Sequence, residues 1–73
     1  MKELTNVQKQ ILVYIINFKQ VNGYSPSNSE IAFALNYSNI SYINRIMHEL
    51  KDKGYITFIE KKPRTIRVLK FIS

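Results

Sequence analysis

Hydrophobic residues recur at helical spacing along the first part of the chain. The stripe that they form consists of Leu4, Val7, Ile11, Leu12, Ile15, Ile16 and Phe18. Thr5 and Gln8 have the spacing of a capping box, in which each side chain satisfies a free backbone N–H group at the helix start. Gly23 can adopt the left-handed conformation that commonly ends helices. The pattern therefore predicts a helix over residues 6–22.

A second, shorter helix is predicted after a connection that contains a proline. Pro26 disfavours helical backbone at Ser25, and Ser27 with Glu30 has the spacing of another capping box. These signals predict a helix over residues 28–35. Asn36 follows at the tight turn between two helices, where the backbone often needs a positive φ that asparagine tolerates better than most residues.

A third helix and a β-hairpin follow this turn. Apolar residues at helical spacing predict a helix over residues 39–53, ended by Gly54. Its expected core positions are Ile40, Ile43, Ile46, Met47 and Leu50. Beyond Gly54, residues 55–59 and 65–69 alternate in polarity and are rich in β-branched and aromatic side chains. The basic loop 60–64 joins them, so we predict an antiparallel hairpin, called the wing, over residues 55–69.

The order of these elements defines the fold class. Three helices followed by a two-stranded antiparallel β-hairpin make an α+β fold, a small winged helix-turn-helix. With 73 residues, the chain is expected to form a single domain over residues 1–73. The apolar run 11–18 is too short to span a membrane and lacks the flanks of a signal peptide. We therefore expect a soluble, cytoplasmic protein.

Charge and composition narrow the classes of function. The sequence has 11 Lys and Arg against 5 Asp and Glu, a net charge of +6. Such an excess favours a polyanionic partner, nucleic acid before acidic lipid, although it can also serve solubility alone. Without cysteine, and with His48 as the single histidine, the chain has neither a disulfide framework nor a thiolate metal site. It also lacks a recognisable catalytic set, so we expect no enzyme activity, cofactor, metal or small-molecule ligand.

Polar side chains gather on the predicted third helix, opposite its apolar stripe. The first two turns of this face carry amides, hydroxyls and a guanidinium rather than the Glu–Lys pairs of a solvated helix. Asparagine can bond adenine, and arginine guanine, through paired hydrogen bonds in the major groove of DNA. The N-terminal half of a recognition helix lies nearest the bases. The predicted base contacts are Asn39, Ser41, Tyr42, Asn44 and Arg45.

Two of these residues have a second interpretation, and other positions fit contacts to the DNA backbone. Asn39 can be the N-cap of its helix, alone or in addition to contacting a base. Tyr42 can fold back onto the core. Phosphate contacts fix the register of a protein on DNA but carry little sequence information. The residues predicted to make them are Ser27, Asn28, His48, Lys61, Lys62 and Arg64.

The chain resembles the N-terminal DNA-binding domain of the LexA repressor family over essentially its whole length. The likeness is carried, at the family's spacing and without gaps, by Leu4, Thr5, Pro26, Glu30–Ala32, Leu35, Leu50, Lys53, Gly54, Ile56, Arg64, Ile66 and Arg67. The resemblance implies a winged helix whose third helix contacts operator bases with its first two turns. Those turns hold the same five residues that the polar face selects.

The sequence also departs from the family pattern. Family members generally have small and acidic residues where Tyr42, Asn44 and Arg45 stand, and a proline in place of Ile40, so we expect a different operator. Asn36 replaces a turn glycine, and residues 60–64 replace the wing glycines, which predicts a stiffer and more cationic wing. The family's self-cleaving C-terminal domain, which also dimerises, does not follow these residues. The chain is thus either a fragment or a free-standing regulator of a phage or mobile element.

These observations converge on an expected function with one alternative. We expect a sequence-specific regulator of transcription that binds double-stranded DNA, a repressor in the first instance, associated with the bacterial nucleoid. A small module buries little surface, so a homodimer on a two-fold operator is expected. The alternative is a winged-helix protein–protein interaction module, such as an antirepressor or regulatory adaptor. Such a module would more often expose apolar anchors and carry fewer lysines.

Overall fold

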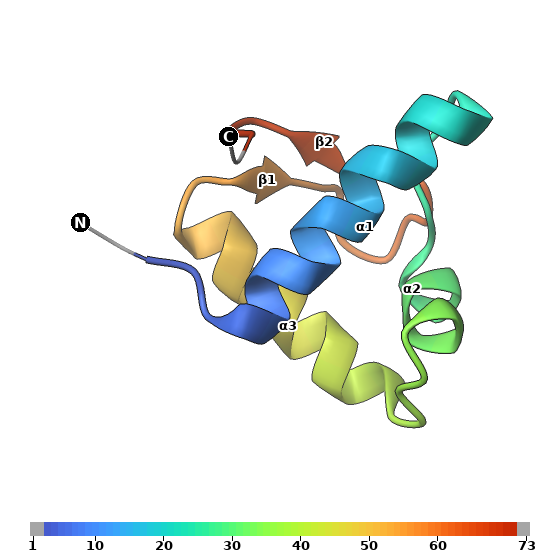
Figure 1. The fold of residues 1–73 in the computed structure, drawn as a ribbon, viewed down its shortest axis with the longest axis horizontal. Helices are drawn as coiled ribbons and strands as arrows, with labels where there is room; N and C mark the ends of the chain where they lie inside the picture. Colours follow the sequence, from blue (N-terminus) through green and yellow to red (C-terminus); the bar gives the residue numbers. More distant parts are fainter. Residues whose placement is uncertain (1–2, 72–73) are drawn as a thin grey trace.

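The computed structural model describes residues 3–71 and contains three helices followed by two short strands (Figure 1). The helices are α1 (Asn6–Asn22), α2 (Asn28–Ala34) and α3 (Ile40–Asp52), and the strands are β1 (Ile56–Thr57) and β2 (Arg67–Val68). The strands are antiparallel, with Ile56 opposite Val68 and Thr57 opposite Arg67. The predicted order of elements and the α+β winged helix-turn-helix fold are confirmed.

The predicted helix-ending residues occupy the positions expected of them. Thr5 and Gln8 form a complete capping box at the start of α1, and Ser27 with Glu30 forms another at the start of α2. Gly23 ends α1 in the left-handed conformation, with φ 82°. Local signals therefore mark where α1 and α2 begin.

The turn between α2 and α3 also follows the sequence signal. Asn36 has a φ of 63°, in the left-handed region that asparagine tolerates. Asn39 is the N-cap of α3, and its side-chain oxygen accepts a hydrogen bond from the backbone N–H of Ser41 at 2.9 Å. As a result, α3 begins at Ile40 and ends at Asp52, one residue inside the predicted range at each end.

The core is built from all three helices and from both arms of the wing. Its members are Ile11, Leu12, Ile15, Ile31, Ala32, Ile43, Ile46, Met47, Leu50, Ile56 and Ile66. The assignment of Ile40 to the core is wrong, because 43% of its surface is exposed. Ile40 is the first residue of α3 and follows an exposed N-cap. It therefore lies at the exposed end of the helix, outside its packing against α1 and α2.

A buried polar bridge joins the start of α1 to the end of α3. Gln8 is only 3% exposed, and its amide nitrogen donates to Glu49 at 2.7 Å. The amide oxygen of the same side chain accepts from the Lys53 ammonium group at 2.6 Å. Gln8 therefore satisfies its buried polar atoms while holding two helices together, in addition to its role in the capping box.

The wing has less regular structure than predicted. The strands were expected over residues 55–59 and 65–69, but each has only two residues. Beyond them, the Thr65 hydroxyl accepts from the backbone N–H of Ile59 at 3.0 Å and lies 3.0 Å from the carbonyl oxygen of Lys62. Lys61 and Arg64 have left-handed φ angles of 62° and 61°. The side chain of Thr65 thus takes the place of ladder hydrogen bonds, and the loop turns away from strand geometry.

Candidate nucleic-acid interface

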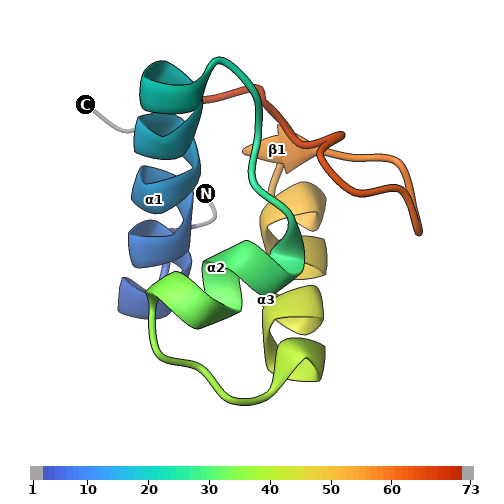
Figure 2. The ribbon, with the colours of Figure 1, turned by 90° about the vertical axis from the view of Figure 1, so that its right-hand side faces the viewer.

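The packing of α3 decides which of its side chains reach solvent. Ile43, Ile46, Met47 and Leu50 are buried, which leaves the opposite side of the helix exposed. Figure 2 shows α2 crossing between α1 and α3, with the loop of the wing projecting on the side of α3. Ser41, Asn44, Arg45 and His48 are all exposed. The polar face and the wing therefore belong to the same side of the molecule.

Asparagine side chains connect the two helices of the helix-turn-helix unit. The amide nitrogen of Asn28, at the start of α2, donates to the side-chain oxygen of Asn44 on α3 at 2.6 Å. Asn39 is engaged with its own helix as the N-cap. The oxygen atoms of Asn39 and Asn44 both have intramolecular partners, so contact of either residue with a base relies mainly on its amide N–H groups.

An aromatic stack supports the arginine of this face. Tyr42 is half-buried, and its ring centroid lies 5.3 Å from that of Tyr37. The guanidinium carbon of Arg45 lies 5.1 Å from the Tyr42 ring centroid, and its Nε is 3.9 Å from a carboxylate oxygen of Glu49. Tyr42 therefore packs partly on the core and at the same time holds Arg45 in a defined orientation.

A groove of about 420 Å³ lies between the start of α2, α3 and the wing. Its lining includes all six residues predicted to contact phosphates: Ser27, Asn28, His48, Lys61, Lys62 and Arg64. His48 joins two walls of the groove, since its Nε2 lies 3.3 Å from Glu60 on the wing and its ring packs edge-on against Phe58. Asn44 also lines the groove, whereas the other predicted base contacts lie on the adjoining turns of α3.

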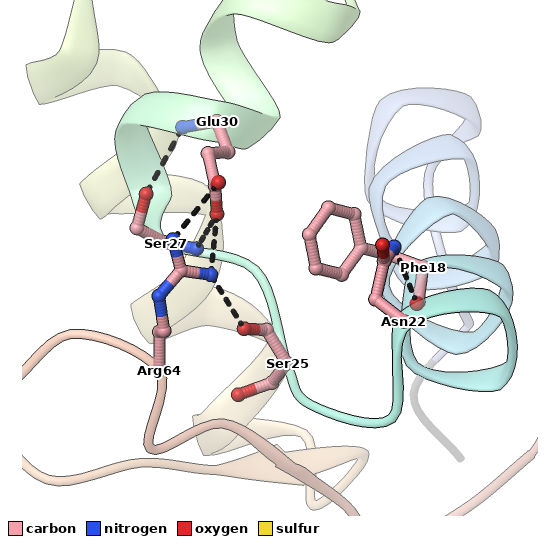
Figure 3. Close-up of polar contacts among 6 residues, drawn as sticks. All are labelled: Phe18, Asn22, Ser25, Ser27, Glu30 and Arg64. Atoms are coloured by element: carbon pink, nitrogen blue, oxygen red, sulfur yellow. Dashed lines mark hydrogen bonds and ion pairs between the residues drawn. The ribbon is translucent and has the colours of Figure 1, made fainter.

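Arg64 extends from the wing loop to the start of α2, and its side chain remains 42% exposed (Figure 3). Its guanidinium makes two hydrogen bonds to the Glu30 carboxylate, at 2.9 and 3.0 Å. It also donates to the backbone oxygen of Ser25 at 3.3 Å and lies 4.8 Å above the Tyr24 ring. Arg64 was predicted to contact DNA phosphates; in the structure its charge is paired with Glu30, and the phosphate contact stays a prediction.

Sequence reasoning missed three residues that shape this surface. Glu30 was taken only as a capping residue, yet it also holds Arg64. Thr65 organises the wing loop, and Gln8 fixes α1 against α3. The spacing of a capping box does not show that Gln8 is buried against α3, and the partners of Gln8 and Glu30 lie more than 30 residues away along the chain.

The fold and this surface define a class of protein. A helix-turn-helix with a polar exposed face on its second helix, next to a basic wing, is a winged-helix DNA-binding module. The family model of the LexA DNA binding domain matches residues 1–65, and the chain belongs to this family. Across residues 3–71, no helix is long and apolar enough to cross a membrane.

Curated relatives carry the same similarity beyond the range of the family model. The chain is 35% identical over 72 residues to the LexA repressor of Ruminiclostridium cellulolyticum, covering 99% of this chain and 34% of that protein. It is 38% identical over 69 residues to the LexA repressors of Staphylococcus epidermidis and Staphylococcus aureus strain Mu3, covering 94% of this chain and 34% and 33% of those proteins. The chain thus spans about a third of the length of these relatives.

Glu30 is expected to make the stability of the fold depend on pH. The hydrogen bonds from Arg64, followed by that from the backbone N–H of Ser27, hold the pKa of Glu30 below its ordinary value. Because the folded-state pKa is the lower one, the stabilisation is fully present above the ordinary glutamate pKa of about 4.3. It is lost as the pH falls through the folded-state pKa. Thermal unfolding followed by circular dichroism across this range measures the loss.

Two variants separate this contribution from general acid destabilisation. Glu30→Gln should lose less stability than the parent protein between neutral and acidic pH, because it has no carboxylate to protonate. Asp52→Asn removes an exposed carboxylate outside the pair and should keep the parent's additional loss. Equal pH dependence in the parent and Glu30→Gln would contradict the assigned role of the pair.

Proposed function

We propose that the protein is a sequence-specific, double-stranded DNA-binding repressor of transcription. The observation that carries this proposal is the exposed polar face of α3, with Arg45 held in place beside a groove that Lys61 and Lys62 line. Membership of the LexA DNA-binding domain family supports it, and the named relatives are repressors. In this proposal the protein acts on chromosomal DNA in the cytoplasm.

Base recognition is assigned to the first two turns of α3. Arg45 is the leading residue, because a guanidinium can bond O6 and N7 of guanine together and this one is oriented before binding. Ser41 offers an exposed hydroxyl, and Asn39 and Asn44 offer amide donors. Tyr42 contributes through its exposed edge, which can contact a thymine methyl group. This set differs from the family's usual residues, so the preferred DNA sequence is expected to differ as well.

Phosphate contacts are assigned to the groove and the wing. Lys61 and Lys62 supply positive charge, and Ser27, Asn28 and His48 supply hydrogen-bonding groups on the walls of the same groove. If about five phosphates are neutralised, the logarithm of the binding constant should fall with the logarithm of the salt concentration at a slope of about −4 to −5. One such module buries little DNA surface, so we propose that two copies bind a two-fold-related site.

A protein-binding role is the second candidate, and one observation favours it. Phe33 is 88% exposed on α2, which is unusual for so large an apolar side chain. A single aromatic residue is a small anchor, however, and the flanking residues of α2 are small or polar. DNA binding explains the exposed polar face of α3 and the wing lysines, which a protein contact at Phe33 does not. The two roles can coexist on different surfaces.

Arg45→Ala is expected to weaken binding to the preferred sequence by about 1–3 kcal/mol and to relax the preference at one base pair. The reason is the loss of paired hydrogen bonds to a base edge, which random DNA does not supply in register. Binding to preferred and random duplexes, followed by fluorescence anisotropy at fixed salt, measures the difference. Equal losses on the two duplexes would count against base recognition by Arg45.

Lys61→Ala combined with Lys62→Ala should weaken binding to every duplex alike. Each neutralised phosphate contributes about 0.9 to the salt slope, so the double variant should flatten the slope by about 2. Affinity measured across a series of salt concentrations gives the slope. The double variant Lys9→Ala with Lys19→Ala removes the same charge from α1 and should leave the slope near that of the parent. An unchanged slope in the wing variant would remove the wing from the interface.

A further inference from the structure

The wing is tied to the start of α2 by a two-pronged ion pair. Arg64 places both terminal nitrogens of its guanidinium on the two carboxylate oxygens of Glu30, at 2.9 and 3.0 Å. This fork geometry fixes orientation as well as distance, which a lysine could not do. Figure 3 shows the side chain reaching from the wing loop to Glu30 in the first turn of α2 and to the backbone oxygen of Ser25, in the connection before that helix.

Glu30 is itself held in place, so it provides a fixed anchor. One of its carboxylate oxygens accepts from the backbone N–H of Ser27 at 2.9 Å, as part of the capping box. The Ser27 hydroxyl in turn accepts from the backbone N–H of Glu30 at 3.2 Å. The carboxylate of Glu30 is therefore held by its own helix. Arg64, which is bonded to that carboxylate, is held in one position as well.

The wing loop depends on such an anchor because its strands are short. β1 and β2 pair over two residues each, so the ladder ends well before the loop that carries Lys61 and Lys62. Thr65 closes the loop on itself, since its side-chain hydrogen bonds go to Ile59 and Lys62 of the same loop. Arg64 has a left-handed φ of 61°, a conformation that costs an arginine free energy and persists when surrounding contacts hold it.

We propose that Arg64 and Glu30 form a clamp that positions the wing so that Lys61 and Lys62 meet DNA phosphates. Arg64 is then a positioning residue, which acts through the wing, and it does not contact a phosphate itself. The inference rests on the proposed DNA binding and adds to it the device that orders the wing. Weaker ties join the wing to α3 from the other side of the groove: His48 lies 3.3 Å from Glu60, and the Lys51 ammonium group donates to the backbone oxygen of Phe58 at 3.4 Å.

Glu30→Gln separates this proposal from simple electrostatics. The substitution removes a negative charge and keeps a side chain that can complete the capping box. If Arg64 contacted phosphate directly, freeing it from Glu30 would leave DNA binding unchanged or make it tighter. The clamp predicts the opposite sign, namely weaker binding and a salt slope flatter by about 1 to 2, because the wing lysines lose their register. Asp52→Asn is the control, because it removes one negative charge without touching the clamp and so shows the effect of the charge change alone on DNA binding.

Two further variants test whether the effect passes through the wing lysines. Arg64→Lys keeps the charge but loses the fork, so it should flatten the slope as Glu30→Gln does, whereas a phosphate contact would survive it. Added to Lys61→Ala with Lys62→Ala, the Glu30→Gln change should flatten the slope little further. A slope that is unchanged or steeper in Glu30→Gln, or fully additive losses in the combined variant, would overturn the proposal.

A measurement without DNA separates failure of the clamp from failure of the proposed function. The sequence contains no cysteine, so Ala34→Cys and Lys62→Cys can carry a pair of spin labels between α2 and the wing. The distance distribution should be narrow in the parent background and broader with Glu30→Gln, in samples that circular dichroism shows to be folded. An equally narrow distribution would overturn the clamp. Absence of binding by the parent protein to any duplex would instead refute the proposed function, while the distance distribution still decides whether the clamp exists.

Discussion

The burial of one face of α3 is the constraint on which the rest of the structure depends. Ile43, Ile46, Met47 and Leu50 lock the helix against α1, α2 and the wing, and they thereby determine which residues face outward. The outward residues need no binding partner to be oriented, because the core has already fixed the helix. A change on the buried face would rotate or loosen the helix and disturb every contact on the other side.

Polar contacts then refine what packing alone leaves free. The Asn28–Asn44 bond connects α2 to α3, and the stack on Tyr42 orients Arg45. The wing is placed in a different way, since its two-residue strands give it little support. Its loop is closed by Thr65 and is attached to α2 by the Arg64–Glu30 pair and to α3 by contacts of His48 and Lys51 with Glu60 and Phe58. The surface thus combines a rigid helix with a wing whose position depends on a few exposed bonds.

Local signals explain how far the sequence could predict this arrangement. The capping boxes, Gly23 and Asn36 act within a few residues of chain, and each has the predicted conformation. Ile40 was misassigned because periodicity does not show where a helix starts to face the core. The strands were predicted too long, because alternating polarity does not show that the Thr65 side chain takes the place of the backbone hydrogen bonds between them. The partner of Arg64 lies 34 residues away, a separation that no local pattern spans, so the Arg64–Glu30 pair could not be predicted from the sequence.

The central claim is that the outward face of α3 recognises a particular DNA sequence. Selection of bound duplexes from a random pool, at a fixed salt concentration and with the unmodified protein, tests it most directly. If α3 recognises bases, one motif should be enriched, present as two half-sites related by two-fold symmetry. Recovery of no enriched sequence, with the protein folded and the pool fully sampled, would contradict it.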